Sequence, residues 1–395
     1  MKRLFIMLTM CLTVASLSIA IQGCGPGDSG TSQPPATQES ATTPAPEPRE
    51  PAPAEPAAHA EPAGPVPSFS LAWSEYPSWS AFGVADEVGL LNKDAGKLGS
   101  VEEKWQVDIV LKEAEYDPCL VMYGSSQVDA VCITNMDALN PSLSVPSVAI
   151  LPTSTSFGAD ACIVSPEITD VAQLKGKKVH GLAQTVSEYC FVRNIEILGE
   201  NPDEYTFSNM DPGAAAIAMQ QKQAEIDAIV VWNPFVLETL NRRPDARVLF
   251  DSTTIPGEII DMVVVTQAAL DKPGGKAFAC AVIDAFYAIN KRMAAEDTRD
   301  DTLIALGEKF SNLDLPSMRK VVQQTKFYAT PEEGLGVLEG EELKGTMEKV
   351  VGFCTKTGIV EKEPSVGYGA KEAAAEAGLR FDPSYIKEAT AKAGS

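Results

Sequence analysis

The chain has 395 residues, with 54 acidic against 32 basic side chains and a formal net charge of −22 at pH 7. An acidic excess of this size argues against nucleic acid and anionic membrane surfaces as partners, because both repel such a protein. Beyond residue 67 about 330 residues remain, roughly twice the length of a usual domain. One large domain or two lobes are therefore expected.

The N-terminus has the features of an export signal. Lys2 and Arg3 precede an apolar stretch over 4–21, and the sequence then reads Ile21-Gln22-Gly23-Cys24. A basic start, an apolar core and a small residue before the cut are typical of a signal peptide. A Cys directly after the cut resembles a bacterial lipoprotein signal, which implies that 1–23 are removed and Cys24 is acylated. The alternatives are a plain signal peptide or an anchor helix, for which the stretch is short.

Residues 25–67 consist largely of Pro, Ala, Glu, Ser and Thr. A segment with so few large apolar side chains buries too little surface to offset its ordering entropy. We therefore interpret 24–67 as a tether between the lipid on Cys24 and a folded body.

Six cysteines remain in the body, and none of them shows CxxC spacing. They are Cys119, Cys132, Cys162, Cys190, Cys280 and Cys354. An even number in an exported protein permits disulfides. We favour free thiols that pack as small buried hydrophobes, since most of them lie in apolar runs. With only His59 and His180 as imidazoles, neither a metal site nor a cofactor is expected.

The body contains an internal repeat. The segments 127–135 and 225–233, QVDAVCITN and EIDAIVVWN, superpose without a gap at an offset of 98 residues. Each follows a helical stretch that opens with Asp-Pro, at Asp117 and at Asp211, where Asp caps a helix and Pro suits its first position. Upstream, each copy has a strand–loop–helix (69–91 and 178–198) and then a strand (107–111 and 205–208). One unit occurs twice, which predicts two similar α/β lobes.

The alternation of strands and helices predicts parallel, helix-covered sheets, as in two Rossmann-like lobes. A short apolar strand over 261–265 follows the second copy and returns the chain to the first lobe. The mostly helical remainder cannot form a third sheet and is assigned to the first lobe. We thus expect residues 68–165 and 256–395 in lobe 1 and 166–255 in lobe 2. Two lobes joined by two crossings form a hinged clamp that closes on a ligand.

At this point the sequence resembles a known family. The signal, the tether, and the segments 174–179 (LKGKKV) and 226–228 (IDA) resemble the solute-binding proteins of ABC importers of the nitrate/sulfonate/taurine type. Residues 72–74 (AWS), 134–137 (TNMD), 232–234 (WNP) and 251–261 (DSTTIPGEIID) are similar to the periplasmic binding proteins found beside urea carboxylase. The resemblance covers roughly 68–360. It implies a type II periplasmic binding protein fold, an ABC permease as partner, a location on the periplasmic side of the membrane with the lipid as the only membrane contact, and a monomer.

The loops after the strands are candidate walls of the cleft, because ligands of open α/β sheets bind at strand ends. These loops carry carboxylates and aromatic rings but no Lys or Arg, a composition that suits a cation. The candidate ligand-binding residues are Trp73, Glu75, Tyr76, Asn135, Asp137, Ser187, Glu188, Trp232, Asn233, Glu258 and Asp261. The expected ligand is a small nitrogen compound, guanidinium or urea-like.

Other interpretations of these residues stay open. The two Trp side chains can be core residues, Asp137 a helix cap, Glu188 a solvated helix residue, the Asn side chains strand-end partners, and Glu258 and Asp261 hinge residues. Asp160, also in these loops, is interpreted as a turn residue. Nitrate, taurine or another sulfonate is the alternative ligand class. An enzyme similar to those of pyrimidine synthesis on the same fold is a lesser alternative, since no Ser-His-Asp set, Cys-His pair or phosphate-binding loop occurs. We expect no catalytic residues.

Overall fold

The computed structural model describes residues 65–94 and 96–393, which belong to one compact unit. The predicted signal, the predicted lipidation site Cys24, His59 and nearly all of the predicted tether lie outside the described residues. Among the helices that are described, none is long and apolar enough to cross a membrane.

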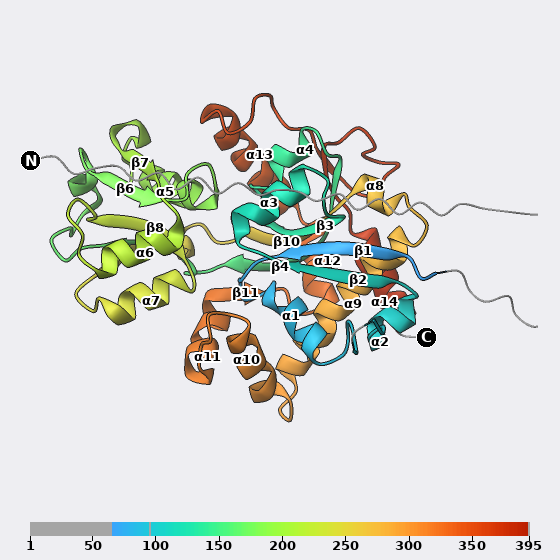
Figure 1. The fold of residues 1–395 in the computed structure, drawn as a ribbon. Helices are drawn as coiled ribbons and strands as arrows, with labels where there is room; N and C mark the ends of the chain where they lie inside the picture. Colours follow the sequence, from blue (N-terminus) through green and yellow to red (C-terminus); the bar gives the residue numbers. More distant parts are fainter. Residues whose placement is uncertain (1–64, 95, 394–395) are drawn as a thin grey trace, which may run out of the picture. The chain divides into compact units, whose positions relative to one another are not determined.

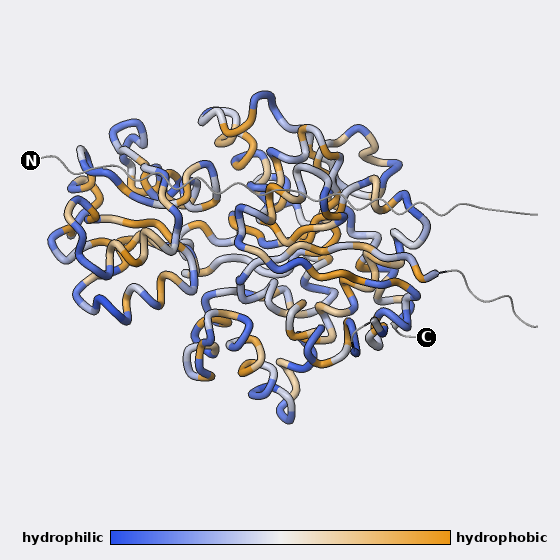
Figure 2. Tube along the Cα trace, in the orientation of Figure 1, coloured by the Kyte–Doolittle hydropathy of each residue, from blue (hydrophilic) through white to orange (hydrophobic). Residues whose placement is uncertain are grey.

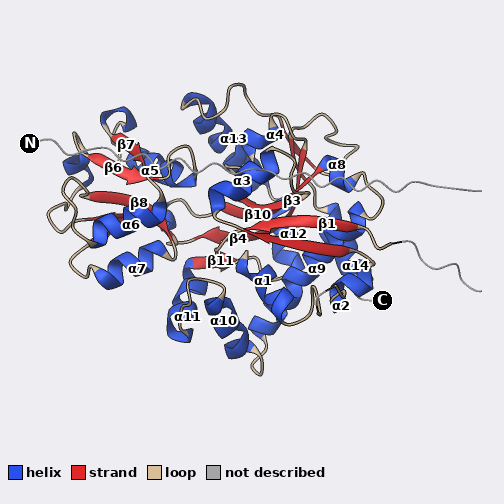
Figure 3. Ribbon diagram, in the orientation of Figure 1, coloured by secondary structure: helices blue, strands red, loops and turns tan. Residues whose placement is uncertain are grey.

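The strands of this part of the chain form two separate sheets (Figures 1 and 3). The first sheet has the order β12-β13-β4-β10-β3-β1-β2, with β11 paired to β4; its strands are β1 (Ser68–Trp73), β2 (Asp108–Glu113), β3 (Ala130–Thr134), β4 (Ser147–Ser156), β10 (Ile260–Thr266), β11 (Thr325–Phe327), β12 (Val366–Tyr368) and β13 (Leu379–Phe381). The second has the order β7-β6-β8-β5-β9; its strands are β5 (Asp160–Val164), β6 (Lys178–Gly181), β7 (Thr206–Asn209), β8 (Ala228–Trp232) and β9 (Arg247–Asp251). We call the residues around these sheets the first and the second lobe.

Helices flank both sheets (Figure 3). They are α1 (Ser80–Glu87), α2 (Ser100–Trp105), α3 (Tyr116–Gly124), α4 (Leu139–Ser142), α5 (Val186–Ile197), α6 (Pro212–Gln220), α7 (Phe235–Arg242), α8 (Gln267–Leu270), α9 (Gly275–Ala294), α10 (Arg299–Glu308), α11 (Leu315–Gln324), α12 (Pro331–Glu339), α13 (Glu341–Lys356) and α14 (Ser384–Ala393). Short 3₁₀ turns are η1 (Val171–Leu174), η2 (Pro202–Glu204) and η3 (Ser252–Thr254).

The two lobes share one topology, as the 98-residue repeat implies. In the first sheet β2, β1 and β3 are parallel neighbours, and in the second sheet β7, β6 and β8 are parallel neighbours in the same order. The repeated segments end in β3 and β8. An antiparallel strand then follows in each sheet, β10 beside β3 and β5 beside β8.

The chain passes between the sheets at 157–159 and again at 252–259. The strand β5 therefore lies in the second sheet, although the sequence analysis placed 160–165 in the first lobe. The difference arises because β5 pairs with β8 and β9, which are 64 and more residues further along the chain.

The region after β10 is mostly helical, as expected, and contains the helices α8 to α14. The strands β11, β12 and β13 were not predicted, because three residues are too few to show an alternating pattern. Asp117 is not a helix cap: Glu115 occupies that position at α3 without a side-chain hydrogen bond. Asp211 does cap α6, accepting a hydrogen bond from the Ala214 N–H.

The core follows from the apolar strands, along which hydrophobic residues concentrate in Figure 2. Residues such as Val131 on β3 and Val263 on β10 are completely buried in the first lobe. Smaller apolar clusters cover the two faces of the second sheet. All six cysteines of the body are buried and free, which confirms the interpretation as small hydrophobes.

Candidate ligand-binding site

A small cavity of about 20 Å³ lies between the two lobes, where the ends of β1, β3 and β8 meet the crossing strands. We call it the deep cavity. Its lining residues are Ser74, Tyr76, Trp79, Tyr116, Thr134, Asp160, Val186, Trp232, Ile259 and Asp261. A volume of this size holds about one water molecule. The lobes must therefore move apart to admit even a small organic ligand.

A continuous series of aromatic rings forms one wall. Tyr76 packs against Trp79 with ring centroids 4.9 Å apart, and Trp79 stacks on Tyr116 at 5.5 Å. Tyr116 in turn meets the Trp232 ring edge-on at 6.2 Å. Since Trp232 ends β8, the series runs from the first lobe to the second. Such faces suit a flat or cationic group.

Three buried carboxylates converge on the same place. Asp137 follows β3, Asp160 begins β5 and Asp261 lies on β10, and they are 7%, 3% and 2% exposed. Burial raises the pKa of Asp137 and of Asp160 to about 6, and the charge of Asp137 adds to the effect on Asp160. Burial, together with the charges of Asp160 and Asp137, also raises the pKa of Asp261 well above its ordinary value.

The hydrogen bonds of this cluster are incomplete. Tyr116 Oη donates to Asp137 Oδ2 at 2.7 Å, Thr134 Oγ1 donates to the same oxygen at 2.9 Å, and Ser154 Oγ donates to Asp261 Oδ2. Tyr76 Oη and Trp79 Nε1, which line the cavity, are buried without an aligned hydrogen bond, although Tyr76 lies beside Asp261. Asp137 Oδ1 lies near the backbone amide of Val186. Because buried polar atoms are nearly always paired, an acceptor on a ligand in the cavity would satisfy the Trp79 N–H.

A wider hollow of about 510 Å³, which we call the mouth, lies beside the deep cavity and shares the lining residues Ser74, Tyr116 and Trp232 with it. Four carboxylates line the mouth, namely Glu75, Glu115, Asp117 and Asp211. In the part of the chain that the structure describes, no Lys, Arg or His lines either compartment. Three other hollows each contain a basic side chain, for example Lys356 or Lys326.

The structure brings together several of the residues singled out in the sequence. Tyr76, Trp232 and Asp261 line the deep cavity, and Asp137 lies directly behind its lining residues Tyr116 and Thr134. Glu75 lines the mouth, where its carboxylate accepts hydrogen bonds from the N–H and Oγ of Ser311.

Other candidates lie outside both compartments. Trp73 is buried against Gly83 of α1, and Ser187 is buried one residue beyond the lining residue Val186. Glu188 accepts a hydrogen bond from the Gln184 N–H ahead of α5.

The two Asn candidates each follow a strand directly, and their side chains form hydrogen bonds to other segments of the chain. Asn135 donates to the Glu258 carbonyl and accepts from the Ile260 N–H, so it connects β3 to the second crossing. Asn233 donates to the Gln324 side chain.

Glu258 takes part in an ion-pair network between the lobes. Its carboxylate accepts hydrogen bonds from Arg193 Nε and Tyr189 Oη of α5 at 2.9 and 2.6 Å, and from Lys349 Nζ of α13 at 2.7 Å. Burial alone would raise the pKa of Glu258, but the hydrogen bonds from Arg193, Lys349 and Tyr189 outweigh it and lower the pKa to about 2. Its charge is thus already compensated.

Sequence reasoning did not single out Tyr116 or Trp79 as site residues, and it interpreted Asp160 as a turn residue. Tyr116 precedes the Asp-Pro pair of the first repeat, so the start of α3 after β2 is equivalent to the start of α6 after β7, which also lines the mouth. This equivalence between the two repeats could have identified Tyr116 as a site residue. Asp160 lies opposite Trp232 in the antiparallel pair of β5 and β8, which no local pattern reveals.

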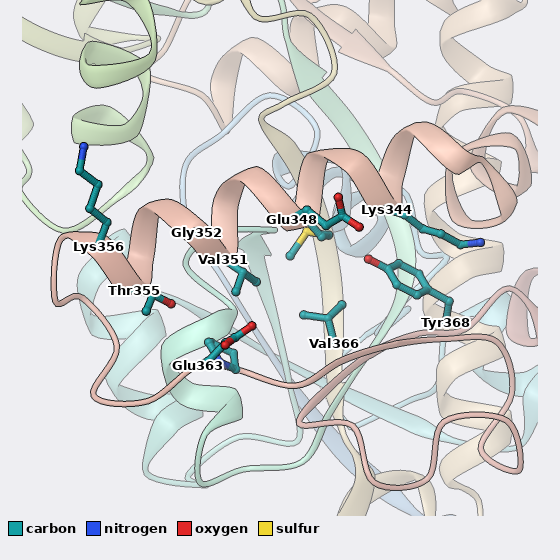
Figure 4. Close-up of a pocket in the computed structure, with 11 residues that line it drawn as sticks. Lys344, Glu348, Val351, Gly352, Thr355, Lys356, Glu363, Val366 and Tyr368 are labelled. Atoms are coloured by element: carbon teal, nitrogen blue, oxygen red, sulfur yellow. The ribbon is translucent and has the colours of Figure 1, made fainter. Parts of the chain in front are cut away.

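A groove of about 620 Å³ lies between α13 and the segment leading into β12 (Figure 4). Lys344 lies over the ring of Tyr368 there, with Nζ 5.9 Å from the centroid. None of its lining side chains is a buried polar group without a partner. Although the groove is larger than the deep cavity, it contains no buried polar group that a ligand would have to satisfy. Within the described residues, no group of His, Cys, Asp and Glu is placed to hold a metal ion.

No family model and no curated protein matches the sequence. Solved structures match it in fold. The periplasmic aliphatic sulphonate binding protein SsuA from Escherichia coli is 17% identical, with a TM-score of 0.60 over 75% of this chain and 89% of that chain. The alkanesulfonate-binding protein SsuA from Xanthomonas axonopodis pv. citri, bound to MOPS, is 14% identical, with a TM-score of 0.60 over 82% and 100%.

A ligand binding component of an ABC-type import system from Staphylococcus aureus is 11% identical, with a TM-score of 0.58 over 82% of this chain and 99% of that chain. At these identities the likeness establishes the fold alone. With its two sheets and two crossings, this mixed α/β chain has the type II periplasmic binding protein fold.

Proposed function

We propose that this protein is an exported, lipid-anchored solute-binding protein that closes on a small nitrogen compound and delivers it to the permease of an ABC importer. We place guanidinium ahead of neutral urea as the ligand. The observation that carries the proposal is the deep cavity, where the buried carboxylates of Asp160 and Asp261 meet an aromatic wall, with Asp137 directly behind it and no basic side chain among the lining residues described.

Charge is the strongest support for a cation. A buried carboxylate without a counter-charge costs several kcal/mol, and a second one nearby adds repulsion. A guanidinium would supply the missing charge, donate to Asp160 and Asp261, and stack on the rings of Trp79 or Trp232. Glu258, by contrast, is proposed to act in lobe closure, because Arg193 and Lys349 already neutralise it.

An anion would meet the opposite environment. The positive end of α5 faces the cleft, but Asp137 already lies near its first amide, that of Val186. A sulfonate or nitrate would therefore face repulsion without a free counter-charge. The sulfonate binders among the solved structures keep this ligand class as the second candidate, which the same experiment tests.

Delivery to a permease is supported by the fold and by the signal and Cys24 of the sequence. A hinged clamp with a cavity at the crossings binds and releases a solute without chemistry. We therefore propose a binding role rather than an enzymatic one, on the periplasmic side of the membrane and as a monomer.

Calorimetry with guanidinium, urea, taurine and nitrate tests the proposal. We expect guanidinium to bind, and Asp261→Asn to weaken its binding by ~2–5 kcal/mol, as when a buried charge pair loses one partner. Asp297→Asn is the matched control, because Asp297 is exposed and lines neither the deep cavity nor the mouth. Binding of taurine or nitrate, with none of guanidinium or urea, would refute the cation assignment.

A further inference from the structure

The lining of the deep cavity offers a hydrogen-bond donor as well as acceptors. The acceptors are the carboxylates of Asp160 and Asp261, which are 3% and 2% exposed. The donor is the indole N–H of Trp79, which also lines the cavity and is 3% exposed. A ligand that fills the cavity therefore meets both kinds of group.

The Trp79 N–H has no partner within the described part of the chain. Its Nε1 atom is buried and forms no hydrogen bond there. Tyr76 Oη, a similar atom of the lining, lies beside the Asp261 carboxylate and so has an acceptor nearby. Because an unpaired buried donor has lost its water without gaining a partner, an acceptor on the ligand would stabilise the complex.

An unpaired indole alone would not indicate a ligand. Trp73 Nε1 is also buried without a partner, but Trp73 packs against Gly83 and lines neither the deep cavity nor the mouth. Trp79 differs because it lines the cavity together with two carboxylates. Tyr76 and Tyr116 pack on the Trp79 ring, with centroids 4.9 and 5.5 Å away. A ligand therefore meets mainly the edge of this ring, to which the N–H belongs.

Neither guanidinium nor urea matches both kinds of group. Guanidinium carries N–H donors but no acceptor for the Trp79 N–H. Urea has a carbonyl acceptor but no positive charge to compensate Asp160 and Asp261. An acceptor that is itself anionic, such as a carboxylate, would be repelled by these two aspartates. The lining thus favours a cation that carries an uncharged acceptor.

Resting on the proposed function, we propose that the natural ligand is a planar guanidinium with a carbonyl group on one nitrogen, as in an acylguanidinium or carbamoylguanidinium. Its N–H groups donate to Asp160 and Asp261, and its carbonyl oxygen accepts from the Trp79 N–H. Conjugation keeps the carbonyl in the plane of the guanidinium, so the molecule is flat enough to lie against the Trp232 ring. Trp79 is then the residue that distinguishes this class of ligand from plain guanidinium.

Titration calorimetry at pH 7 with acetylguanidinium and ethylguanidinium tests this inference, because these cations differ by a carbonyl in place of a methylene group. Guanidinium and urea are the reference ligands. We expect acetylguanidinium to bind about tenfold more tightly than ethylguanidinium, as for one hydrogen bond to a buried donor.

Two variants locate the effect. Trp79→Phe keeps an aromatic ring but removes the donor, so the affinity ratio of the two cations should fall about fivefold or more. Ethylguanidinium should bind this variant nearly as well as wild type, which also shows that the variant is folded. Trp105→Phe is the matched control and should leave the ratio unchanged, because the Trp105 indole donates to Asp284 outside the cleft.

The outcomes separate this inference from the proposed function. If guanidinium and ethylguanidinium bind and acetylguanidinium has no advantage, the carbonyl is wrong and the cation-binding function stands. If none of these cations binds, the proposed cation-binding function falls as well. An advantage of acetylguanidinium that persists in Trp79→Phe would overturn the role of the Trp79 N–H.

Discussion

The ionisation of the buried aspartates should control whether the ligand-free cleft is open or closed. In the closed form Asp160 is 3% exposed. Its burial, and to a smaller extent the charge of Asp137, raise the pKa of Asp160 from 3.8 to about 6. Opening the cleft returns the carboxylate to water. Replacing Asp160 by Asn keeps the shape of a protonated aspartate and removes the charge, so Asp160→Asn should favour the closed form.

The magnitude follows from the pKa. The difference between about 6 and 3.8, at 1.36 kcal/mol per pKa unit, corresponds to about 3 kcal/mol. Below pH 3.8 the carboxyl is protonated in both forms and makes no difference. Between pH 3.8 and 6 the open form ionises first, so the closed form loses stability as pH rises, and above pH 6 the full cost is present. At pH 8 the variant should therefore favour closure by about 3 kcal/mol, or more than 100-fold in the equilibrium constant.

Small-angle X-ray scattering of ligand-free protein from residue 65 onward, titrated between pH 4 and 8, measures this. The wild type should show a larger radius of gyration at pH 8 than at pH 4.5, and Asp160→Asn should stay compact to a higher pH. Asp297→Asn, which removes an exposed charge, should behave as wild type. Identical titration curves for wild type and Asp160→Asn would refute the reasoning.

Three further outcomes are expected. The affinity for guanidinium should fall as pH decreases from 7 to 5, because protons compete for Asp137 and Asp160, whose pKa values are near 6. If the carboxylates did not contact the ligand, calorimetry would show an affinity that is independent of pH across that range. Glu258→Gln should destabilise the protein at pH 7 by about 1–2 kcal/mol, a small value because Lys349 is half exposed and its ion pair with Glu258 is partly screened by water. The difference between variant and wild type in thermal unfolding should shrink as pH falls from 4.5 toward 2, because Glu258 becomes protonated. The ligand-induced change in tryptophan fluorescence should be reduced in Trp232→Phe, where Trp79 still lines the cavity, and unchanged in Trp105→Phe, whose indole donates to Asp284 outside the cleft. Loss of the signal in Trp105→Phe would argue against the cavity as the site.

The repeat made the architecture predictable, because two copies of one strand order determine two similar sheets. The same logic located Tyr76, Trp232 and Asp261, which follow or lie on apolar strands and whose neighbours are set by the local chain direction. The sequence analysis was wrong for residues whose structural partners lie far away in the sequence. Asp160 faces the cleft because β5 pairs with β8, and Glu258 is neutralised by Arg193 and Lys349, which lie 65 and 91 residues away. No local pattern encodes such charge compensation.

The two crossings of the chain have a consequence for the order of events when the clamp closes. Asp160 directly follows the crossing at 157–159, and Asp261 follows the crossing at 252–259. Points beside a pivot move least when two rigid bodies rotate, so the spacing of these two carboxylates changes little on opening. Trp232 lies opposite Asp160 in the pairing of β8 with β5, and Val186 begins α5, so both belong to the second lobe. A solute bound at these two carboxylates would therefore have the Trp232 ring beside it before closure, and rotation of the second lobe would complete its contacts.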